Sequence, residues 1–248
     1  MAVMKKISIL IPAYNEQEVL PILFKRLDDL ADGQKEYQFE FLFVNDGSRD
    51  DTLSIISQYA EKDQRVAYIN LSRNFGKEIA MIAGLDHVTG DATVIIDADL
   101  QDPPELIPEM MKLWQDGYDD VYAKRRSRQG ESWFKKFTSK AYYRTLQRVT
   151  HVPIQEDTGD YRLLDKRVVA AIRQFRDTQR NAKAIFSWVG FKKIEILYDR
   201  DERVAGNTKW SYPKLINLAV DGITSFTTSP LRAASIAGAV FSLYQLRF

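Results

Sequence analysis

The sequence contains no cysteine and no long apolar run, and these two absences remove several classes of protein. Without cysteine there is neither a disulfide framework nor a thiolate metal site, which fits a reducing compartment. No stretch reaches the roughly 18 apolar residues of a membrane span. The N-terminus, Met1 to Lys6, leads into a strand pattern without the apolar segment of a signal peptide. The 248 residues, 45% of them hydrophobic, are enough to bury one substantial core.

Two common phosphate-binding motifs are also missing. No G-x-G-x-x-G follows the first strand and no G-x-x-x-x-G-K-[ST] occurs anywhere, which argues against a dinucleotide site or a P-loop. The net charge of +1 excludes a generally polyanion-binding surface, although it conceals local asymmetry. A nucleotide can still bind if a metal holds its phosphates and if Glu16 and Asp46 accept hydrogen bonds from base and ribose. Turn formation or helix N-capping is an equally supported role for these two acids.

Short apolar runs alternate with amphipathic helical patterns along the chain. Strands are predicted at Lys6–Pro12, Phe39–Val44, Val66–Asn70, Val94–Ile96 and Lys193–Tyr198, and helices around residues 19–30, 51–61, 77–87, 166–175 and 181–189. This alternation predicts βαβ units, and hence an α/β fold with a mostly parallel, Rossmann-like sheet flanked by helices. Ligands bind at the carboxyl ends of the strands in such sheets. The polar clusters 14–16, 45–47 and 97–99 each follow a strand and are therefore expected to converge on one edge.

The stretch that follows the fourth predicted strand carries the most specific chemistry. In an extended segment, Asp97, Asp99 and Gln101 would present their oxygens to one side, because alternate side chains share a face. Such hard oxygen donors suit Mg²⁺ or Mn²⁺ held together with substrate phosphates. The alternative interpretation is an ordinary Asx-type turn before a double proline.

Five motifs together resemble those of the polyisoprenyl-phosphate glycosyltransferases. They are IPAYNE, VNDGSRDDT, LSRNFGKEIAMIAGLDHVTGD, DADLQDPPE and DTGDYRLLDK, and the resemblance covers roughly Lys5 to Arg232. These enzymes, of the bactoprenol glucosyltransferase and dolichyl-phosphate mannose synthase type, are inverting transferases with the GT-A fold. The resemblance implies a nucleotide-sugar donor, a divalent metal and a lipid-phosphate acceptor.

Residue roles follow from the same motifs. The resemblance implies that Asp97, Asp99 and Gln101 contact the metal, and that Pro12, Tyr14, Glu16, Asp46 and Lys77 line the nucleotide pocket. Arg203 to Trp210 resembles the family's R-x-x-G-x-[ST]-K-[WY] loop, in which Arg203 and Lys209 would meet the diphosphate, an ordinary basic loop being the alternative. Asp157 stands where the family carries its active-site acid, and we favour it over Asp160, for which a structural role is expected. Since a phosphate monoester is mostly dianionic at pH 7, Asp157 is expected to position substrate more than to accept a proton.

A basic segment with interleaved aromatic residues follows Ala123. Residues 124–148 hold nine Lys or Arg and one acid, so the rest of the chain sums to −7. Arg125, Arg126, Lys135 and Lys136 are expected to hold the acceptor phosphate and to dock the chain on anionic membrane. Nucleic acid is the competing polyanion, which the segment alone does not exclude, and a solvated helix is the unremarkable alternative. Beside a glycosyltransferase core, the membrane interpretation is favoured.

The end of the sequence departs from the family pattern. Residues 212–226 predict a helix lying along the membrane, but Ala233 to Tyr244 supplies only about twelve apolar residues, too few for a span. A natural short form, a truncated product or a piece cut within the first span explain this equally well. Peripheral attachment at the cytoplasmic face of the membrane is the safer expectation. Exposure of Ala237, Val240 and Leu243 would favour contacts between copies of the chain, hence a homo-oligomer.

Taken together, the sequence predicts a GT-A catalytic domain over residues 1–210 and an amphipathic membrane-associated segment over 211–248. The expected activity is transfer of a hexose, with glucose as first choice, from a UDP-sugar to undecaprenyl phosphate, with inversion and no nucleic acid partner. A transferase acting on a saccharide and a non-catalytic nucleotide-sugar-binding regulator are the alternatives. The basic aromatic segment argues against the first, and the complete set Asp97, Asp99, Gln101 and Asp157 argues against the second.

Overall fold

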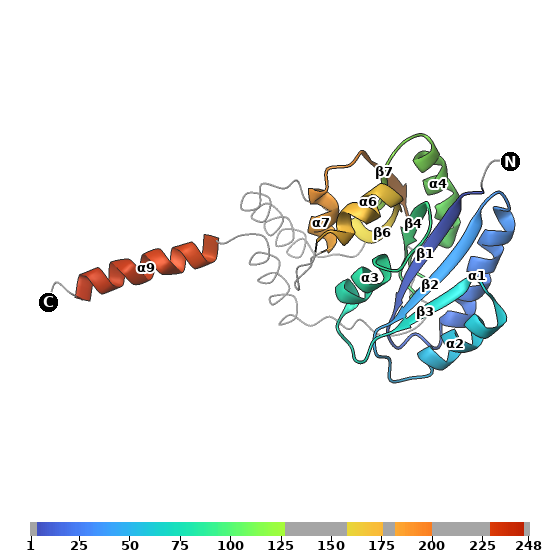
Figure 1. The fold of residues 1–248 in the computed structure, drawn as a ribbon, viewed down its shortest axis with the longest axis horizontal. Helices are drawn as coiled ribbons and strands as arrows, with labels where there is room; N and C mark the ends of the chain where they lie inside the picture. The colour runs from blue at the N-terminus through green and yellow to red at the C-terminus, as the bar shows by residue number, and fades with distance from the viewer. Residues whose placement is uncertain (1–3, 127–157, 176–181, 200–228, 246–248) are drawn as a thin grey trace. The chain divides into compact units, whose positions relative to one another are not determined.

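The structure is a computed structural model that describes residues 4–126, 158–175, 182–199 and 229–245. The chain divides into two compact units, Met1–Gln129 with Asp157–Asn207, and Gly130–Glu156 with Thr208–Phe248. All strands of the described residues belong to the first unit (Figure 1). The described part of the second unit is a single helix, α9 (Ser229–Gln245). The expected division at residue 210 stays a prediction.

Seven strands of the described residues form one mixed sheet in the order β3-β2-β1-β4-β6-β5-β7. They are β1 (Lys6–Ala13), β2 (Gln38–Asn45), β3 (Val66–Asn70), β4 (Ala92–Ile95), β5 (Asp120–Arg125), β6 (Thr158–Asp165) and β7 (Lys193–Tyr198). Only β6 runs antiparallel to its neighbours, and the other pairings are parallel. The predicted, mostly parallel sheet is therefore confirmed. The amino end of β6 lies at the same edge as the carboxyl ends of the other six strands.

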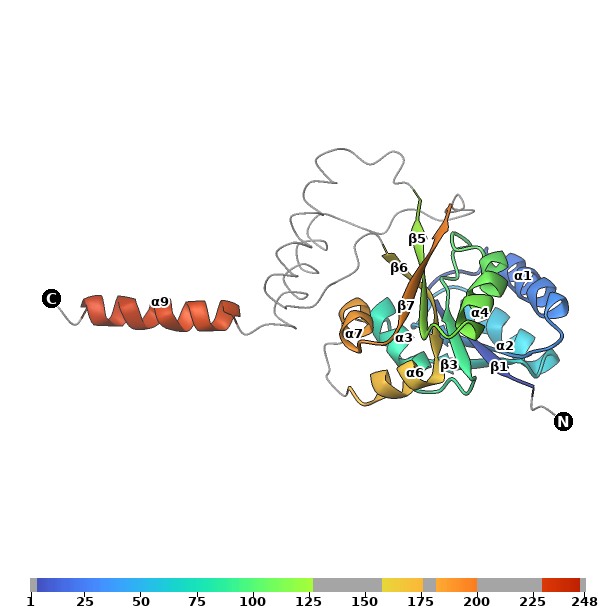
Figure 2. The same cartoon turned by 90° about the horizontal axis from the view of Figure 1, so that it is seen from above.

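Helices cover both faces of the sheet. They are α1 (Leu20–Gly33), α2 (Thr52–Lys62), α3 (Lys77–Leu85), the 3₁₀ turn η1 (Pro104–Leu106), α4 (Ile107–Gln115), α6 (Lys166–Arg173) and α7 (Ala182–Trp188). Helices α1, α2 and α4 lie on one face, and α3, α6 and α7 on the other (Figures 1 and 2).

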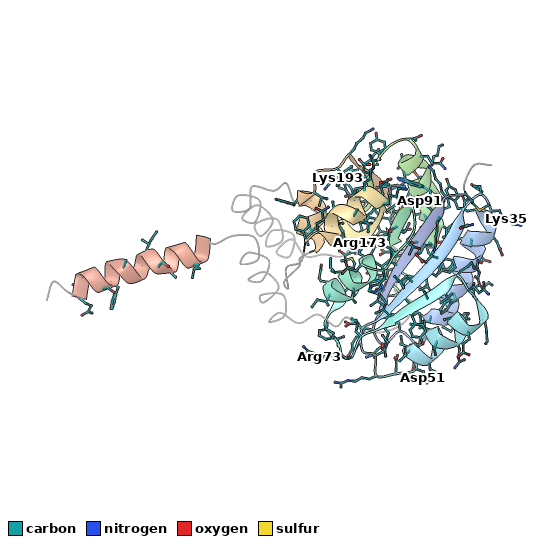
Figure 3. All side chains as sticks on the ribbon, viewed as in Figure 1. Lys35, Asp51, Arg73, Asp91, Arg173 and Lys193 are labelled. Atoms are coloured by element: carbon teal, nitrogen blue, oxygen red, sulfur yellow. The ribbon has the colours of Figure 1, made fainter. Side chains whose placement is uncertain are left out.

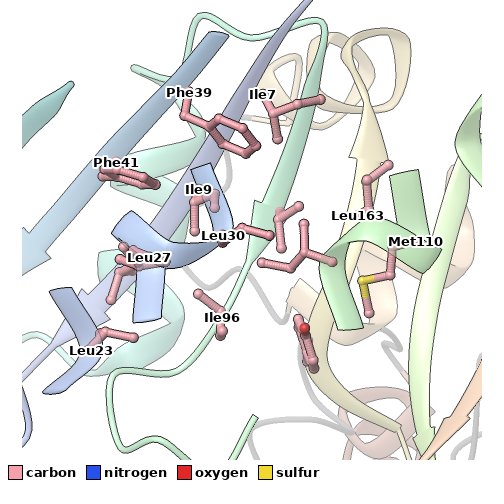
Figure 4. Packing of buried hydrophobic residues seen from close by; sticks show 14 of the residues in the cluster. Ile7, Ile9, Leu23, Leu27, Leu30, Phe39, Phe41, Ile96, Met110 and Leu163 are labelled. Carbon is pink, nitrogen blue, oxygen red and sulfur yellow. The ribbon is translucent and has the colours of Figure 1, made fainter. Parts of the chain in front are cut away.

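The alternation of side chains along the strands builds a core on each face. In β1, Ile7, Ile9 and Ile11 belong to the buried cluster of α1 and α4, whereas Leu10 belongs to that of α3 and α6. In Figure 4, Leu27 of α1 lies near Ile9 in the first cluster. Apolar side chains on both faces explain why the sequences of β1, β2 and β4 are nearly continuous hydrophobic runs, each interrupted by one polar residue.

The half of the sheet after β4 contains a buried ion pair. The Arg162 guanidinium of β6 lies 3.2 Å from the carboxylate of Asp120 on β5, and each side chain is 1% exposed. Lys193 of β7 approaches the same carboxylate at 3.9 Å, and the Phe186 ring lies 4.1 Å from the guanidinium carbon. Burial raises the pKa of Asp120, although Arg162 and Lys193 act in the opposite direction. The Asp120 carboxylate on β5 is therefore contacted by a cation from each neighbouring strand, β6 and β7.

Most predicted element boundaries lie within two residues of those in the structure. Strands β3 and β7 have the predicted bounds, β1 is one residue longer at its carboxyl end, and β2 is one residue longer at each end. Strand β4 begins at Ala92 and ends at Ile95, instead of spanning the predicted Val94–Ile96. Helix α4 and strand β5 were not predicted. Helix α3 ends at Leu85, because the chain turns at Asp86 and His87 instead of continuing.

Helix α9 exposes large apolar side chains along its length. Leu231, Ile236, Phe241 and Tyr244 are 60–70% exposed. Its 17 residues fall short of a bilayer span, and no helix in the described part of the chain is long and apolar enough to cross a membrane. The predicted helix over residues 212–226 lies outside the described residues.

Candidate active site

The polar segments after β1 and β2 meet at the carboxyl edge of the sheet, as predicted. The Asn15 backbone N–H donates to Ser48 Oγ at 3.0 Å, and the Asn15 side-chain oxygen accepts from the Arg49 N–H at 2.8 Å. The Glu16 N–H donates to Thr52 Oγ1 at 2.8 Å. These bonds fix the two loops against each other and place Glu16 beside the start of α2.

Figure 3 shows the two ends of the parallel strands. Asp51 and Arg73, which follow β2 and β3, lie at the carboxyl edge, whereas Lys35 and Asp91, which precede β2 and β4, lie at the opposite end. The candidate site therefore occupies the edge where open α/β sheets bind their ligands.

Asp46, the first residue after β2, anchors the loop that precedes α3. Its two carboxylate oxygens accept the backbone N–H groups of Phe75 at 2.7 Å and Gly76 at 2.9 Å. The next residue, Gly47, has a φ of 63°, and a Cβ there would come within 2.3 Å of the Arg73 backbone. Asp46 is only 3% exposed, and in the structure its carboxylate holds this loop in place. Its predicted contact with the nucleotide stays a prediction.

Lys77, the first residue of α3, brings two acids together. Its Nζ lies 2.5 Å from Asp97 Oδ1 and 2.7 Å from Asp160 Oδ2. Asp97 is two residues beyond Ile95, and Asp160 is two residues before Arg162, the antiparallel partner of Ile95. Continuing this register places the two acids side by side across the end of the sheet. Burial lowers the pKa of Lys77, but the carboxylates of Asp160 and Asp97 outweigh it and hold the pKa well above its ordinary value.

The predicted extended geometry of the Asp97–Gln101 segment is wrong. Strand β4 ends at Ile95, residues 98 and 99 form a turn, and Leu100 has a φ of 62°. The Asp99 carboxylate accepts the Gln101 backbone N–H at 3.2 Å within this turn. The three side chains therefore do not alternate on one face of a strand. A turn replaces the extended segment because the chain must leave the sheet and reverse toward η1.

The structure adds Asp160 to the site and leaves five predicted residues undescribed. Asp160 is 10% exposed on its side chain and pairs with Lys77, although the sequence favoured a structural role for it. Its position beside Asp97 depends on the antiparallel pairing of β6 with β4, which no local sequence pattern indicates. The predicted residues that lie outside the described ranges are Asp157, Lys135, Lys136, Arg203 and Lys209.

The remaining predicted residues all reach the same edge. Pro12 is the last residue but one of β1, and Tyr14 and Glu16 follow the strand, each partly exposed. Arg125 and Arg126 lie at the carboxyl end of β5, and Arg126 pairs with Asp199 at 3.7 Å. Donor-side and acceptor-side candidates therefore share one edge of one sheet.

The donor set suits a hard divalent cation bound together with a phosphate ligand. Asp97 and Asp99 are carboxylates at partly exposed positions. The described residues contain no group of three or more His, Cys, Asp or Glu that would hold a metal without further ligands. Mg²⁺ and Mn²⁺ are commonly held by one or two carboxylates plus substrate phosphates, which the two acids satisfy. The Lys77 ammonium already rests between Asp97 and Asp160, so these acids accept a positive charge.

The fold is that of a GT-A-type glycosyltransferase. Residues 8–173 match the family model for Glycosyl transferase family 2, and the chain belongs to this family. It is 47% identical over 243 residues to the uncharacterized glycosyltransferase sll0501 of Synechocystis, covering 98% of this chain and 76% of that protein. It is 44% identical to the prophage bactoprenol glucosyl transferase homolog of Escherichia coli, and the alignment covers 95% of this chain and 76% of that protein. It is also 44% identical to the bactoprenol glucosyl transferase of Shigella phage SfX, covering 94% and 76%.

Solved structures support the fold. Mannosyl-3-phosphoglycerate synthase from Rubrobacter xylanophilus aligns with a TM-score of 0.60 at 16% identity, over 93% of this chain and 75% of that one. Glucosyl-3-phosphoglycerate synthase from Mycobacterium tuberculosis, solved with Mn²⁺, UDP-glucose and phosphoglyceric acid, aligns with a TM-score of 0.57 at 17% identity, over 87% and 76%. At these identities the likeness concerns the fold alone.

Proposed function

We propose that this chain transfers glucose from UDP-glucose to a polyprenyl phosphate at a membrane surface, with inversion at the anomeric carbon. Relatives at 43–44% identity are named bactoprenol glucosyl transferases, and they align with 94–95% of the chain. The carboxyl edge of the sheet gathers acids and a cation from three separate segments, in the region that the sequence motifs of the donor site had indicated.

The observation that carries the proposal is the contact of Lys77 with Asp97 and Asp160. The Lys77 ammonium, held by two carboxylates beside the Asp97–Gln101 turn, is suited to contact an anionic diphosphate that binds together with a divalent metal ion. On donor binding, the Lys77 ammonium can turn to the diphosphate, since its side chain is 39% exposed. Glu16 and Tyr14 lie on the neighbouring loop and are proposed to meet the nucleoside part.

The transfer itself needs little proton chemistry from the protein. An oxygen of the acceptor phosphate attacks the anomeric carbon, and the bond from that carbon to the diphosphate oxygen breaks, its electron pair leaving with UDP. A phosphate monoester is largely dianionic at pH 7, so no strong general base is required. Asp157 is proposed to position the acceptor or the sugar. A bound Mg²⁺ or Mn²⁺ would neutralise the charge of the departing diphosphate.

The acceptor side is proposed to use the basic residues after β5. Arg125 and Arg126 lie at the same edge as Lys77, where they would attract an anionic headgroup. Lys135 and Lys136 are proposed to continue this surface toward the membrane. Each basic residue near an anionic bilayer contributes about 1 kcal/mol, so several suffice for reversible attachment.

The test is a transfer assay with labelled nucleotide sugars, polyprenyl phosphate and Mn²⁺, followed by organic extraction. Label from UDP-glucose is expected in the organic phase, and Asp99→Asn is expected to reduce it at least 100-fold, a typical loss when one electrostatic stabiliser is removed. Asp51→Asn, an exposed acid at the same edge, is the matched control and is expected to keep full activity.

Each negative result has a distinct meaning. Unchanged transfer after rigorous chelation with EDTA contradicts the metal assignment. Label that moves to a water-soluble saccharide instead supports a saccharide transferase. Tight UDP-glucose binding without any transfer supports a non-catalytic regulator.

A further inference from the structure

The turn that carries Asp97 and Asp99 adopts a conformation that its own sequence does not favour. Leu100, in the middle of the turn, has a φ of 62° and is 1% exposed. A branched side chain in the left-handed region costs about 1–2 kcal/mol relative to a right-handed one. Such strain persists only where surrounding contacts over-determine the backbone. The contacts that hold this turn should therefore lie outside it.

Two tyrosines from other strands supply those contacts. The Tyr161 hydroxyl of β6 donates to the Pro103 carbonyl at 2.6 Å. The Tyr198 hydroxyl of β7 donates to Asp102 Oδ1 at 2.8 Å. The tyrosines are 1% and 5% exposed, and Asp102 is 5% exposed, so both hydrogen bonds are shielded from water. They fix two consecutive residues just beyond Gln101.

The two tyrosine rings also support each other. Their centroids lie 5.9 Å apart with an interplanar angle of 85°, an edge-to-face contact. Strand β5 lies between β6 and β7 in the sheet, so the pair of rings reaches across it. The resulting support is rigid because each ring sits on a strand and leaves little room for another rotamer.

The same contacts link the turn to the end of β5. Burial raises the pKa of Tyr198, and Asp102 raises it further, whereas Arg125 acts in the opposite direction. The Nε of Arg125 is buried and has no hydrogen-bond partner among the described residues. Arg125 is one of the residues proposed to meet the acceptor phosphate. Tyr198 thus stands between the proposed acceptor side and the turn that carries the proposed metal ligands.

We propose that Tyr161 and Tyr198 are positioning residues that hold the Asp97–Gln101 turn in its metal-binding conformation, through Pro103 and Asp102. The proposal rests on the proposed function, because it takes Asp97 and Asp99 as the residues that hold the cation. Neither tyrosine is proposed to bind the cation itself. Tyr161 holds the Pro103 backbone carbonyl and Tyr198 holds the Asp102 side chain, and both residues follow the turn that carries the carboxylates.

The experiment measures Mn²⁺ binding in the presence of saturating UDP by electron paramagnetic resonance of the free ion. Loss of a contact that orients metal ligands typically weakens metal affinity 10- to 100-fold. We expect Tyr198→Phe and Tyr161→Phe each to raise the Kd for Mn²⁺ about tenfold or more. Tyr68→Phe is the matched control, because Tyr68 lies on the distant edge strand β3 with 43% exposure, and its Kd is expected to stay unchanged.

A second measurement separates positioning from folding. Thermal unfolding of each variant without metal is recorded, and Mn²⁺ titrations are performed at a temperature where every variant is folded. If folded Tyr198→Phe and Tyr161→Phe bind Mn²⁺ as the wild type does, the tyrosines have only a structural role and the inference is overturned. If the wild type itself does not bind Mn²⁺ with UDP, the metal assignment in the proposed function fails and the inference falls with it.

Discussion

Replacing Lys77 with methionine should change metal binding and transfer in opposite directions. The ammonium lies 2.5 Å from Asp97 and 2.7 Å from Asp160, so in the unliganded protein it competes with a divalent cation for Asp97. Methionine keeps much of the apolar stem and removes the charge. Mn²⁺ should then bind more tightly in the absence of nucleotide, whereas glucosyl transfer should slow because the diphosphate loses a cationic partner.

The size of the effect follows from distance and exposure. At an effective dielectric constant of 20, a unit-charge pair 4 Å apart interacts by about 4 kcal/mol, but a side chain that is 39% exposed is partly screened. Part-exposed ion pairs contribute up to about 1 kcal/mol after screening and side-chain entropy are counted. Since about 1.4 kcal/mol corresponds to tenfold in affinity, the Kd for Mn²⁺ should fall about fivefold.

The assay is a Mn²⁺ titration without nucleotide, paired with the organic-extraction transfer assay. Lys6→Met is the matched control, because Lys6 pairs with Glu40 at 3.1 Å with a similar exposure of 34%, at the opposite end of β1. That variant should alter neither readout. An unchanged or weaker Mn²⁺ affinity in Lys77→Met would show that the ammonium and the cation do not share Asp97, and would refute the reasoning.

Two further predictions concern stability. Asp120→Asn should lower the free energy of unfolding by about 3–5 kcal/mol in urea denaturation, because it leaves the Arg162 charge buried without a full partner. The double variant Asp120→Asn with Arg162→Met should recover much of this loss. Equal losses in the single and double variants would contradict this account. Burial raises the pKa of Asp165, but hydrogen bonds, first from Trp114, outweigh it and hold the pKa below its ordinary value. Asp165 therefore stabilises the fold fully above an unfolded-state pKa of about 3.9, and this contribution should be lost as pH falls from there through the lower folded-state pKa. Acid unfolding of Asp165→Asn should lack this component, and an unchanged pH profile would argue against it.

The first half of the sheet was predictable because its signals are local. Strands β1, β2 and β3 are short runs of apolar residues closed by turn formers, and each core position follows from alternation along the strand. The convergence of the loops after β1, β2 and β4 follows from parallel topology alone. No contact between distant residues had to be known for either inference.

The second half depends on pairings between distant residues. Strand β5 ends in Lys124 and Arg125, and its composition indicated the start of a basic surface segment instead of a buried strand. Arg162 is a charged residue between Tyr161 and Leu163 in β6, and its burial becomes reasonable only with Asp120, 42 residues away. Asp160 was assigned a structural role for the same reason, since its proximity to Asp97 depends on the antiparallel register of β4 and β6.

Backbone strain at the carboxyl edge connects these observations to the proposed function. The described residues contain two non-glycine positions with positive φ, Asn15 at 55° and Leu100 at 62°, and both follow strands at this edge. Gly47 at 63° and Gly76 at 96° stand in the neighbouring loops. Glycine and asparagine adopt this conformation readily, so three of these turns are indicated by residue type. The positive φ of Leu100 is not indicated by its residue type, and Leu100 is the residue that separates Asp99 from Gln101. The sequence therefore indicates where the chain turns at this edge. The orientation of the Asp97 and Asp99 carboxylates depends on contacts from β6 and β7, which no local sequence pattern contains.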